Sequence, residues 1–203
     1  MNAMEYGKII GWHGTTHNSA EQIKKKGFQF EKYKFGKNNQ RLPNDLGAGV
    51  YFFVEDHYFE KPTALAYKYV LKYKDRELAQ TNTKPKVLKA EINYDEDCML
   101  DLDEKDNMEA IMGLQKTLKK ELYQAAKNLK QSGAVNRGNL DGLVIELLIE
   151  KFMRDYKIDI DIVAKRTFTN VEEELGGVPI RRSNFPNGKE IAIRKIELIT
   201  NLE

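Results

Sequence analysis

The chain contains very few of the residues that hold small or metal-bound domains together. Its 203 residues include one cysteine, Cys98, and three histidines, His13, His17 and His57. A single cysteine excludes an internal disulfide framework and a cysteine-rich zinc site. The histidines are too few and too scattered for a metal site, so we expect no bound metal. Cys98 lies beside an acidic turn, which predicts an inert thiol.

Long apolar runs and a strong excess of one charge are also missing. No run approaches the roughly 18 apolar residues that a membrane span needs, and the first residues lack the apolar core of a secretory signal. We therefore expect a cytoplasmic protein without a membrane partner. The net charge is only +2, which argues against general nucleic-acid binding but is compatible with a local basic face.

The remaining composition is typical of a globular chain, with 41% apolar and 32% charged residues. We predict one domain over residues 1–203. Local patterns predict helices that begin at Ser19, at Pro62 and near Asp141, and a helix over 104–131. They also predict a polar loop over 75–84. They predict a first strand that ends near residue 13, and further strands over 51–54, 86–93, 99–102, 158–163 and 190–196.

The stretch Gly-Trp-His-Gly-Thr-Thr over residues 11–16 joins an apolar strand to a helix. Ser19 is a good N-cap, with Gln22 placed to complete a capping box, and Gly27 ends the helix. His13 therefore stands at a strand end beside a glycine, where a ligand can approach the backbone. Gly47 and Gly49 precede a second strand in the same manner, but no Gly-Lys-Ser/Thr follows, so this is no phosphate loop.

Two amphipathic helices over about 104–157 form a helical insertion between strands. The first carries a row of lysines opposite its apolar stripe, which we interpret as a solvated face in preference to a nucleic-acid contact. These lysines are Lys116, Lys119, Lys120, Lys127 and Lys130.

Five segments in order carry a resemblance to a known family: Trp12-His-Gly-Thr15, Lys26-Gly-Phe28, Gly47-Ala-Gly-Val-Tyr-Phe52, Ala64-Leu-Ala-Tyr67, and Glu190 at the start of a last strand. Together they resemble the ADP-ribosyltransferase catalytic domain, in the His-Tyr-Glu branch of diphtheria-type toxins and poly(ADP-ribose) polymerases. The resemblance implies an α+β fold of two facing antiparallel sheets with a cleft for NAD, the co-substrate. It covers residues 6 to about 102 well and the last strand loosely.

The resemblance also implies how NAD is held. His13 matches the histidine that bonds the adenosine-side ribose, and Thr15 is placed to help it. The backbone of Gly14 matches the group that holds the nicotinamide carboxamide. The segment 28–45 would be the donor loop, in which Arg41 and Lys37 are the phosphate partners.

Four further positions concern the nicotinamide end of NAD and the reaction. Tyr51 and Tyr67 match the aromatic residues that sandwich the nicotinamide ring. Glu190 matches the glutamate at the nicotinamide ribose, where a carboxylate stabilises the oxocarbenium-like sugar formed as nicotinamide departs. Ala64 stands where many family members have a serine that bonds the carboxamide. The sequence leaves competing carboxylates open: Glu91, Glu172, Glu173 and Glu174.

The resemblance thus implies an ADP-ribosyltransferase that moves one ADP-ribose unit to an unknown acceptor, with His13, Tyr51 and Glu190 as catalytic residues. Three alternatives remain. An RNA 2′-phosphotransferase would also consume NAD but needs basic groups that are not evident after His13. A non-catalytic module would bind NAD or ADP-ribose without turnover. An interaction protein would act through the helical insertion.

Overall fold

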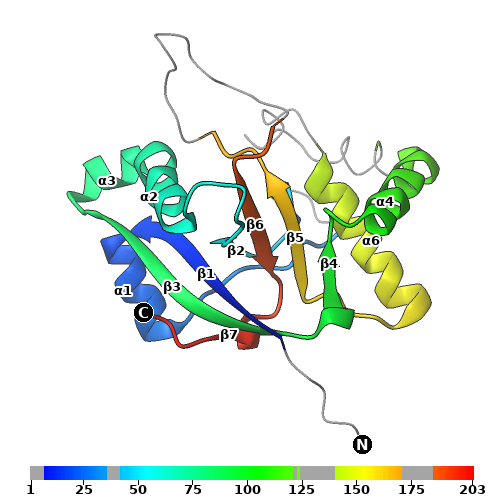
Figure 1. The fold of residues 1–203 in the computed structure, drawn as a ribbon, viewed down its shortest axis with the longest axis horizontal. Coiled ribbons are helices and arrows are strands. Elements are labelled where there is room, and N and C mark those ends of the chain that lie inside the picture. The colour runs from blue at the N-terminus through cyan, green and yellow to red at the C-terminus, as the bar shows by residue number, and fades with distance from the viewer. Residues whose placement is uncertain (1–6, 36–41, 121–122, 124–139, 171–184) are drawn as a thin grey trace, which may run out of the picture.

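The fold is α+β, as predicted, and is built on one mixed sheet (Figure 1). A computed structural model describes residues 7–35, 42–120, 123, 140–170 and 185–203. Its strands are β1 (Gly7–Thr16), β2 (Val50–Val54), β3 (Pro85–Tyr94), β4 (Met99–Asp101), β5 (Ile162–Thr167), β6 (Gly188–Ile193) and β7 (Ile199–Thr200). The described α-helices are α1 (His17–Lys26), α2 (Pro62–Tyr73), α3 (Asp75–Thr81), α4 (Lys105–Thr117) and α6 (Asp141–Tyr156).

The predicted pair of facing antiparallel sheets is corrected to a single seven-stranded sheet. Its strand order is β4-β5-β6-β2-β1-β3-β7, and every neighbouring pair is antiparallel except β4 and β5. The junction between β1 and β2 is narrow, because only Gly11 pairs with Val54 and Trp12 with Phe53. By contrast, β1 pairs with β3 over its whole length. Figure 1 shows β1 and β3 running obliquely to β5 and β6 beyond this junction.

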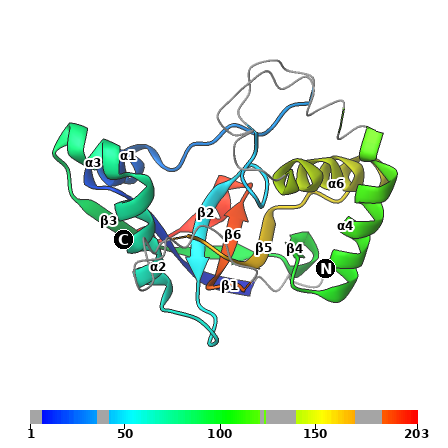
Figure 2. The same ribbon diagram turned by 90° about the horizontal axis from the view of Figure 1, so that it is seen from above.

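Helices cover the two ends of the sheet separately. Figure 2 shows α1, α2 and α3 beside the β1–β3 part, and α4 and α6 beside β4 and β5. Apolar side chains of β2 that alternate along the strand pack on opposite faces: Phe53 packs with Leu65 and Ala66 of α2, whereas Phe52 belongs to a cluster with Ile92 and Ile191. The narrow junction between β1 and β2 therefore lies between two packed layers.

Helix α6 is part of the main core, although it lies in the predicted insertion. Its buried Leu143 and Leu148 share a cluster with Leu46, Val163 and Ala192, which come from three other parts of the chain. An added Cβ at Gly142 of the same helix would lie 1.8 Å from the carbonyl oxygen of Asn44. Deleting residues 104–157 would thus expose core surface, and such a deletion does not test an interaction role cleanly.

Several local predictions were wrong for identifiable reasons. The N-cap of α1 is Thr16 instead of Ser19, because the Thr16 hydroxyl accepts the Ser19 N–H and also bonds Glu77 of α3. The predicted loop over 75–84 contains α3. The strand predicted over 158–163 is displaced to Ile162–Thr167, because pairing with β4 and β6 begins at Ile162, next to Asp161, whose backbone bonds Cys98 and Arg194. Gly27 ends α1 as predicted, at a φ of 75°.

The first testable prediction concerns Gly14, which is buried on β1 against α2. An added Cβ would lie 2.1 Å from the carbonyl oxygen of Ala66 and 2.9 Å from Val70 Cγ2. We expect Gly14→Ala to lower the free energy of unfolding by at least about 1–3 kcal/mol, because α2 must move away to make room for the added methyl group. Gly113→Ala is the control, since an added Cβ at that exposed helical position meets nothing within 4 Å apart from its chain neighbours and its own helix backbone, and stability should rise by about 0.5–1 kcal/mol. Urea unfolding measures both, and equal effects would contradict this packing account.

Candidate functional site

The predicted catalytic residues lie on three neighbouring strands. His13 is on β1, Tyr51 on β2 and Glu190 on β6, and these strands are consecutive in the sheet order β6-β2-β1. Residues that are far apart in the sequence are therefore brought to one region of the sheet. This region includes the narrow β1–β2 junction.

His13 is held by a hydrogen bond to the backbone of β2. Its Nδ1 lies 2.8 Å from the carbonyl oxygen of Tyr51. Its ring meets Phe28 edge-on with centroids 5.1 Å apart and contacts Phe52 at 5.6 Å. A carbonyl oxygen only accepts, so Nδ1 carries the hydrogen and Nε2 of the neutral ring is an acceptor. The imidazole thus uses its donor internally and keeps one ring nitrogen that can only accept a hydrogen bond.

The environment of His13 disfavours its charged form. Burial is the main cause of its lowered pKa, and the charge of Lys74 acts in the same direction, whereas the bond to Tyr51 opposes them. Lys74, which pairs with Glu77 at 3.1 Å, is a cation near His13 that the sequence did not single out. The neutral ring is therefore favoured at neutral pH.

A second prediction follows from this lowered pKa. Between the folded pKa and the ordinary value of 6.5, the unfolded chain binds more protons than the folded chain, so stability falls as the pH falls through this window. His13→Gln keeps a donor for the Tyr51 carbonyl but does not titrate. We expect the loss of unfolding free energy between about pH 7.5 and pH 5.5 to be smaller in this variant. An unchanged loss would contradict the assignment of a lowered pKa.

Tyr51 anchors the loop that precedes its own strand. Its hydroxyl donates to the carbonyl oxygen of Gly47 at 2.7 Å and accepts the Leu46 N–H at 2.9 Å. Burial raises the pKa of the phenol well above its ordinary value, and the charges of Glu190 and Asp45 raise it further. The hydrogen bond from Leu46 lowers this pKa, but by less than burial raises it. The ring is therefore a fixed, neutral surface and not a mobile proton donor.

A buried ion pair fixes the same loop from the other side. Arg194 makes two bonds to Glu146 of α6, at 2.5 and 3.1 Å, and also donates to the Ala48 carbonyl oxygen. Glu146 accepts the Ala48 N–H at 2.6 Å, while Gly47 adopts a φ of +86°. Sequence reasoning missed this pair, although a glutamate within the apolar run Leu143–Leu148 was a usable signal.

Glu190 lies in β6 opposite Phe53 of β2 and Lys165 of β5. One carboxylate oxygen accepts a hydrogen bond from the Thr169 hydroxyl. Burial is the main cause of its raised pKa and the charge of Asp45 adds to it, whereas the Thr169 and Thr167 side chains lower it. Thr167 Oγ1 is buried but does not reach hydrogen-bond geometry. Asp45, which the sequence analysis did not consider, thus acts on both Glu190 and Tyr51.

The three side chains do not all share one face of the sheet. Tyr51 pairs with Ala192 and Phe53 with Glu190, and paired residues share a face, so Tyr51 and Glu190 lie on the same side. The His13 ring instead packs with Phe28 and Phe52. Among the described residues no contact joins His13 to Glu190, and their link runs through Tyr51.

The remaining predicted site residues are placed as follows. Gly14 and Thr15 are buried in β1, and close packing on α2 is sufficient to require the glycine. Tyr67 is 45% exposed on α2 and stacks on no other ring in the described part of the chain. Arg41 lies outside the described residues, as does Lys37.

Among the competing carboxylates, Glu91 is excluded by its position. It lies on β3 and bonds Lys8 at 3.1 Å and Asn201 at 2.5 Å, away from Tyr51. The other three competitors, Glu172, Glu173 and Glu174, lie outside the described residues. Glu190 is thus the candidate that the geometry favours over Glu91.

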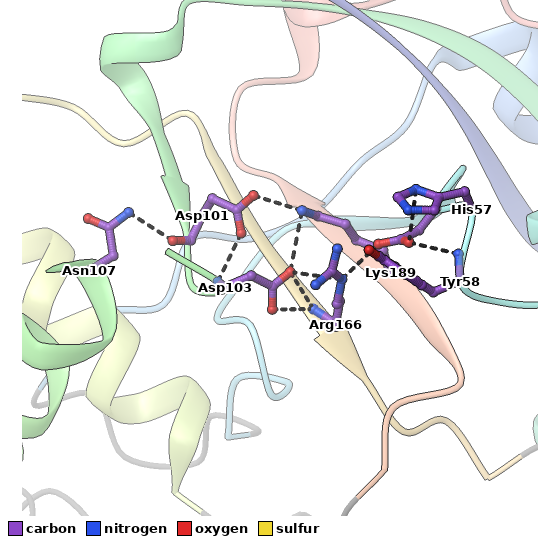
Figure 3. A network of polar contacts seen from close by, with 8 residues as sticks. His57, Tyr58, Asp101, Asp103, Asn107, Arg166 and Lys189 are labelled. Carbon is purple, nitrogen blue, oxygen red and sulfur yellow. Dashed lines mark hydrogen bonds and ion pairs between the residues drawn. The ribbon is translucent and has the colours of Figure 1, made fainter. Parts of the chain in front are cut away.

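Figure 3 shows a network of charges next to Glu190 in the sequence. Lys189 bonds Asp101 at 2.7 Å and lies 3.3 Å from Asp103, and Arg166 bonds Asp56 at 2.8 Å. The Arg166 N–H also donates to Asp103. This network ties the adjacent ends of β5 and β6 to the segments after β2 and β4. It therefore limits movement of the strand that carries Glu190.

Other features of the described chain add little to the site. A hollow along α1, lined by residues such as Ser19, Gln22 and Gln29, includes none of the three catalytic candidates. The pKa of Cys98 is raised by burial and by nearby carboxylates, so its thiol is protonated at neutral pH. No described group of three or more side chains has the arrangement of a metal site. Among the described helices, none has both the length and the apolarity to cross a membrane.

Comparisons with protein-family models, with curated proteins and with solved structures found no match to this chain.

Proposed function

We propose that the protein is an NAD-dependent ADP-ribosyltransferase that transfers one ADP-ribose unit to an acceptor and releases nicotinamide. One observation carries the proposal: His13, Tyr51 and Glu190, predicted as a catalytic set, come from three adjacent strands, with Tyr51 and Glu190 on one face and the His13 imidazole, on the other face, bonded to the Tyr51 backbone at the narrow β1–β2 junction. Nothing in the local sequence pattern requires residues 13, 51 and 190 to be neighbours in the sheet.

The proposed reaction uses each group according to its chemistry. His13 accepts a hydrogen bond from a ribose hydroxyl through Nε2, and the Tyr51 ring, fixed by its two hydroxyl bonds, is a surface for the nicotinamide. The bond between the nicotinamide nitrogen and the anomeric carbon breaks, and its electron pair leaves with nicotinamide. The ionised Glu190 carboxylate interacts more strongly as positive charge develops on the sugar, which lowers the barrier. An acceptor nucleophile then bonds the anomeric carbon and loses its proton.

One observation favours a second candidate, a module that binds NAD without turnover. Burial and the charge of Asp45 raise the pKa of Glu190, which disfavours the ionised carboxylate that the reaction needs. In such a module the same site would hold NAD, but nicotinamide would not be released.

The proposal is tested with NAD labelled in its adenylate part. Purified protein is incubated with it, alone and in a cell lysate, and free nicotinamide and labelled macromolecules are measured. Release of nicotinamide together with label on an acceptor supports the transferase. NAD binding by calorimetry without release over hours supports the binding module. Absence of NAD binding contradicts both.

A further inference from the structure

Thr169 lies between β5 and β6 and is clamped by the side chain of Asn187. The Thr169 N–H donates to Asn187 Oδ1 at 2.9 Å, and Asn187 Nδ2 donates to the Thr169 carbonyl oxygen at 2.8 Å. The Asn187 N–H donates to the Thr167 carbonyl oxygen at 2.9 Å. The Asn187 amide thus bonds both backbone groups of Thr169, as a paired strand residue would. It extends the hydrogen bonding between β5 and β6 beyond their last paired residues, Thr167 and Gly188.

The clamped threonine donates its hydroxyl to Glu190. The next residue, Asn170, accepts a bond from Lys72 of α2 at 2.8 Å. The segment carrying Thr169 is therefore held on one side by Asn187 and on the other by α2. A hydroxyl held in this way presents its hydrogen to the carboxylate from a fixed direction.

The charges around Glu190 make this donor important. Asp45 raises the pKa of Glu190 by repulsion, in addition to the effect of burial. Lys165 stands opposite Glu190 on β5 but forms no ion pair with it among the described contacts, and Lys72 of α2 bonds Asn170. A hydroxyl that donates to the carboxylate favours its ionised form.

We propose that Thr169, held by Asn187, is a positioning residue for Glu190. It occupies one carboxylate oxygen, fixes the plane of the carboxylate, and leaves the second oxygen to accept a hydroxyl of the nicotinamide ribose. The role of that second oxygen rests on the proposed function. The positioning itself concerns only the described side chains.

The test is a titration of the Glu190 carboxyl carbon by NMR in the free protein. We expect Thr169→Val to move the Glu190 midpoint to higher pH, Thr169→Ser to leave it near that of the parent, and Asn187→Ala to raise it by less than Thr169→Val. Thr167→Val is a graded comparison, because the Thr167 side chain also lowers the pKa of Glu190 but by less than Thr169 and does not reach hydrogen-bond geometry, so it should move the midpoint less. A Thr169→Val midpoint equal to that of the parent overturns the inference.

This outcome is separate from that of the proposed function, because the titration needs no NAD. If the midpoint moves but the parent does not release nicotinamide, the positioning role stands and the proposed reaction fails. If the parent is active, we expect Thr169→Val to lower kcat more than it changes KM for NAD and to shift the pH–rate profile upward, with rescue by Thr169→Ser. An active Thr169→Val variant with unchanged kcat and pH profile also overturns the inference.

Discussion

Glu190→Gln is expected to reduce nicotinamide release by about 100- to 1000-fold while NAD binding is retained. The substitution keeps the size of the side chain and an acceptor for the Thr169 hydroxyl, but it removes the negative charge that would stabilise the developing sugar cation. Loss of one such preorganised interaction typically has this effect on kcat. Nicotinamide release gives the rate, and calorimetry gives the affinity for NAD.

Glu91→Gln is the matched control for this experiment. Glu91 is also a strand glutamate but lies on β3, where it bonds Lys8 and Asn201, so its variant should retain full activity. If Glu190→Gln turns over NAD at the parental rate, Glu190 has no part in the mechanism. If both variants lose activity equally, the effect is not specific to the site.

The largest expected effect on stability is that of Glu146→Ala. The substitution leaves Arg194 buried without its partner and removes the acceptor of the Ala48 N–H. Breaking one side of a buried ion pair costs about 3–5 kcal/mol, which is a large part of the total stability of a typical domain. We expect the free energy of unfolding, measured in urea, to fall by about this amount, with a lower urea midpoint. We also expect the loop before Tyr51, which carries Gly47 and Ala48, to lose its fixed position.

Glu150→Ala separates the ion pair from general effects on α6. Glu150 is one turn further along the helix and is exposed, so its loss should change the unfolding free energy by no more than about 0.5 kcal/mol. Similar values for Glu146→Ala and Glu150→Ala would show that the buried pair does not hold the loop.

Local signals in the sequence predicted most of the elements. The turn at Gly27, the proline that opens α2 and the dense β-forming run over 51–54 each act within a few residues, and the structure has all three features. The strand over 158–163 was misplaced because alternation alone does not reveal which residues find partner strands, and β5 pairs with β4 and β6 only from Ile162 onward. The helix α3 was missed because short polar helices have little apolar periodicity.

Features that depend on distant partners were beyond the sequence. The joining of all strands in one sheet rests on two residue pairs between β1 and β2, and the core role of α6 rests on contacts with Leu46 and Ala192. At the site, the sequence indicated His13 and Glu190 but not the Tyr51 carbonyl that fixes the imidazole or the Thr169 hydroxyl that bonds the carboxylate. Both contacts join residues at least 21 positions apart.

The most direct test of the central claim is an NMR titration of the parent protein with NAD, with assigned signals for His13, Tyr51 and Glu190. The account predicts that the His13 ring, the Tyr51 ring and the Glu190 carboxyl all shift together at one saturating NAD concentration. Shifts confined to other residues, for example along the α1 hollow, would contradict the claim that these three strands form a shared NAD site.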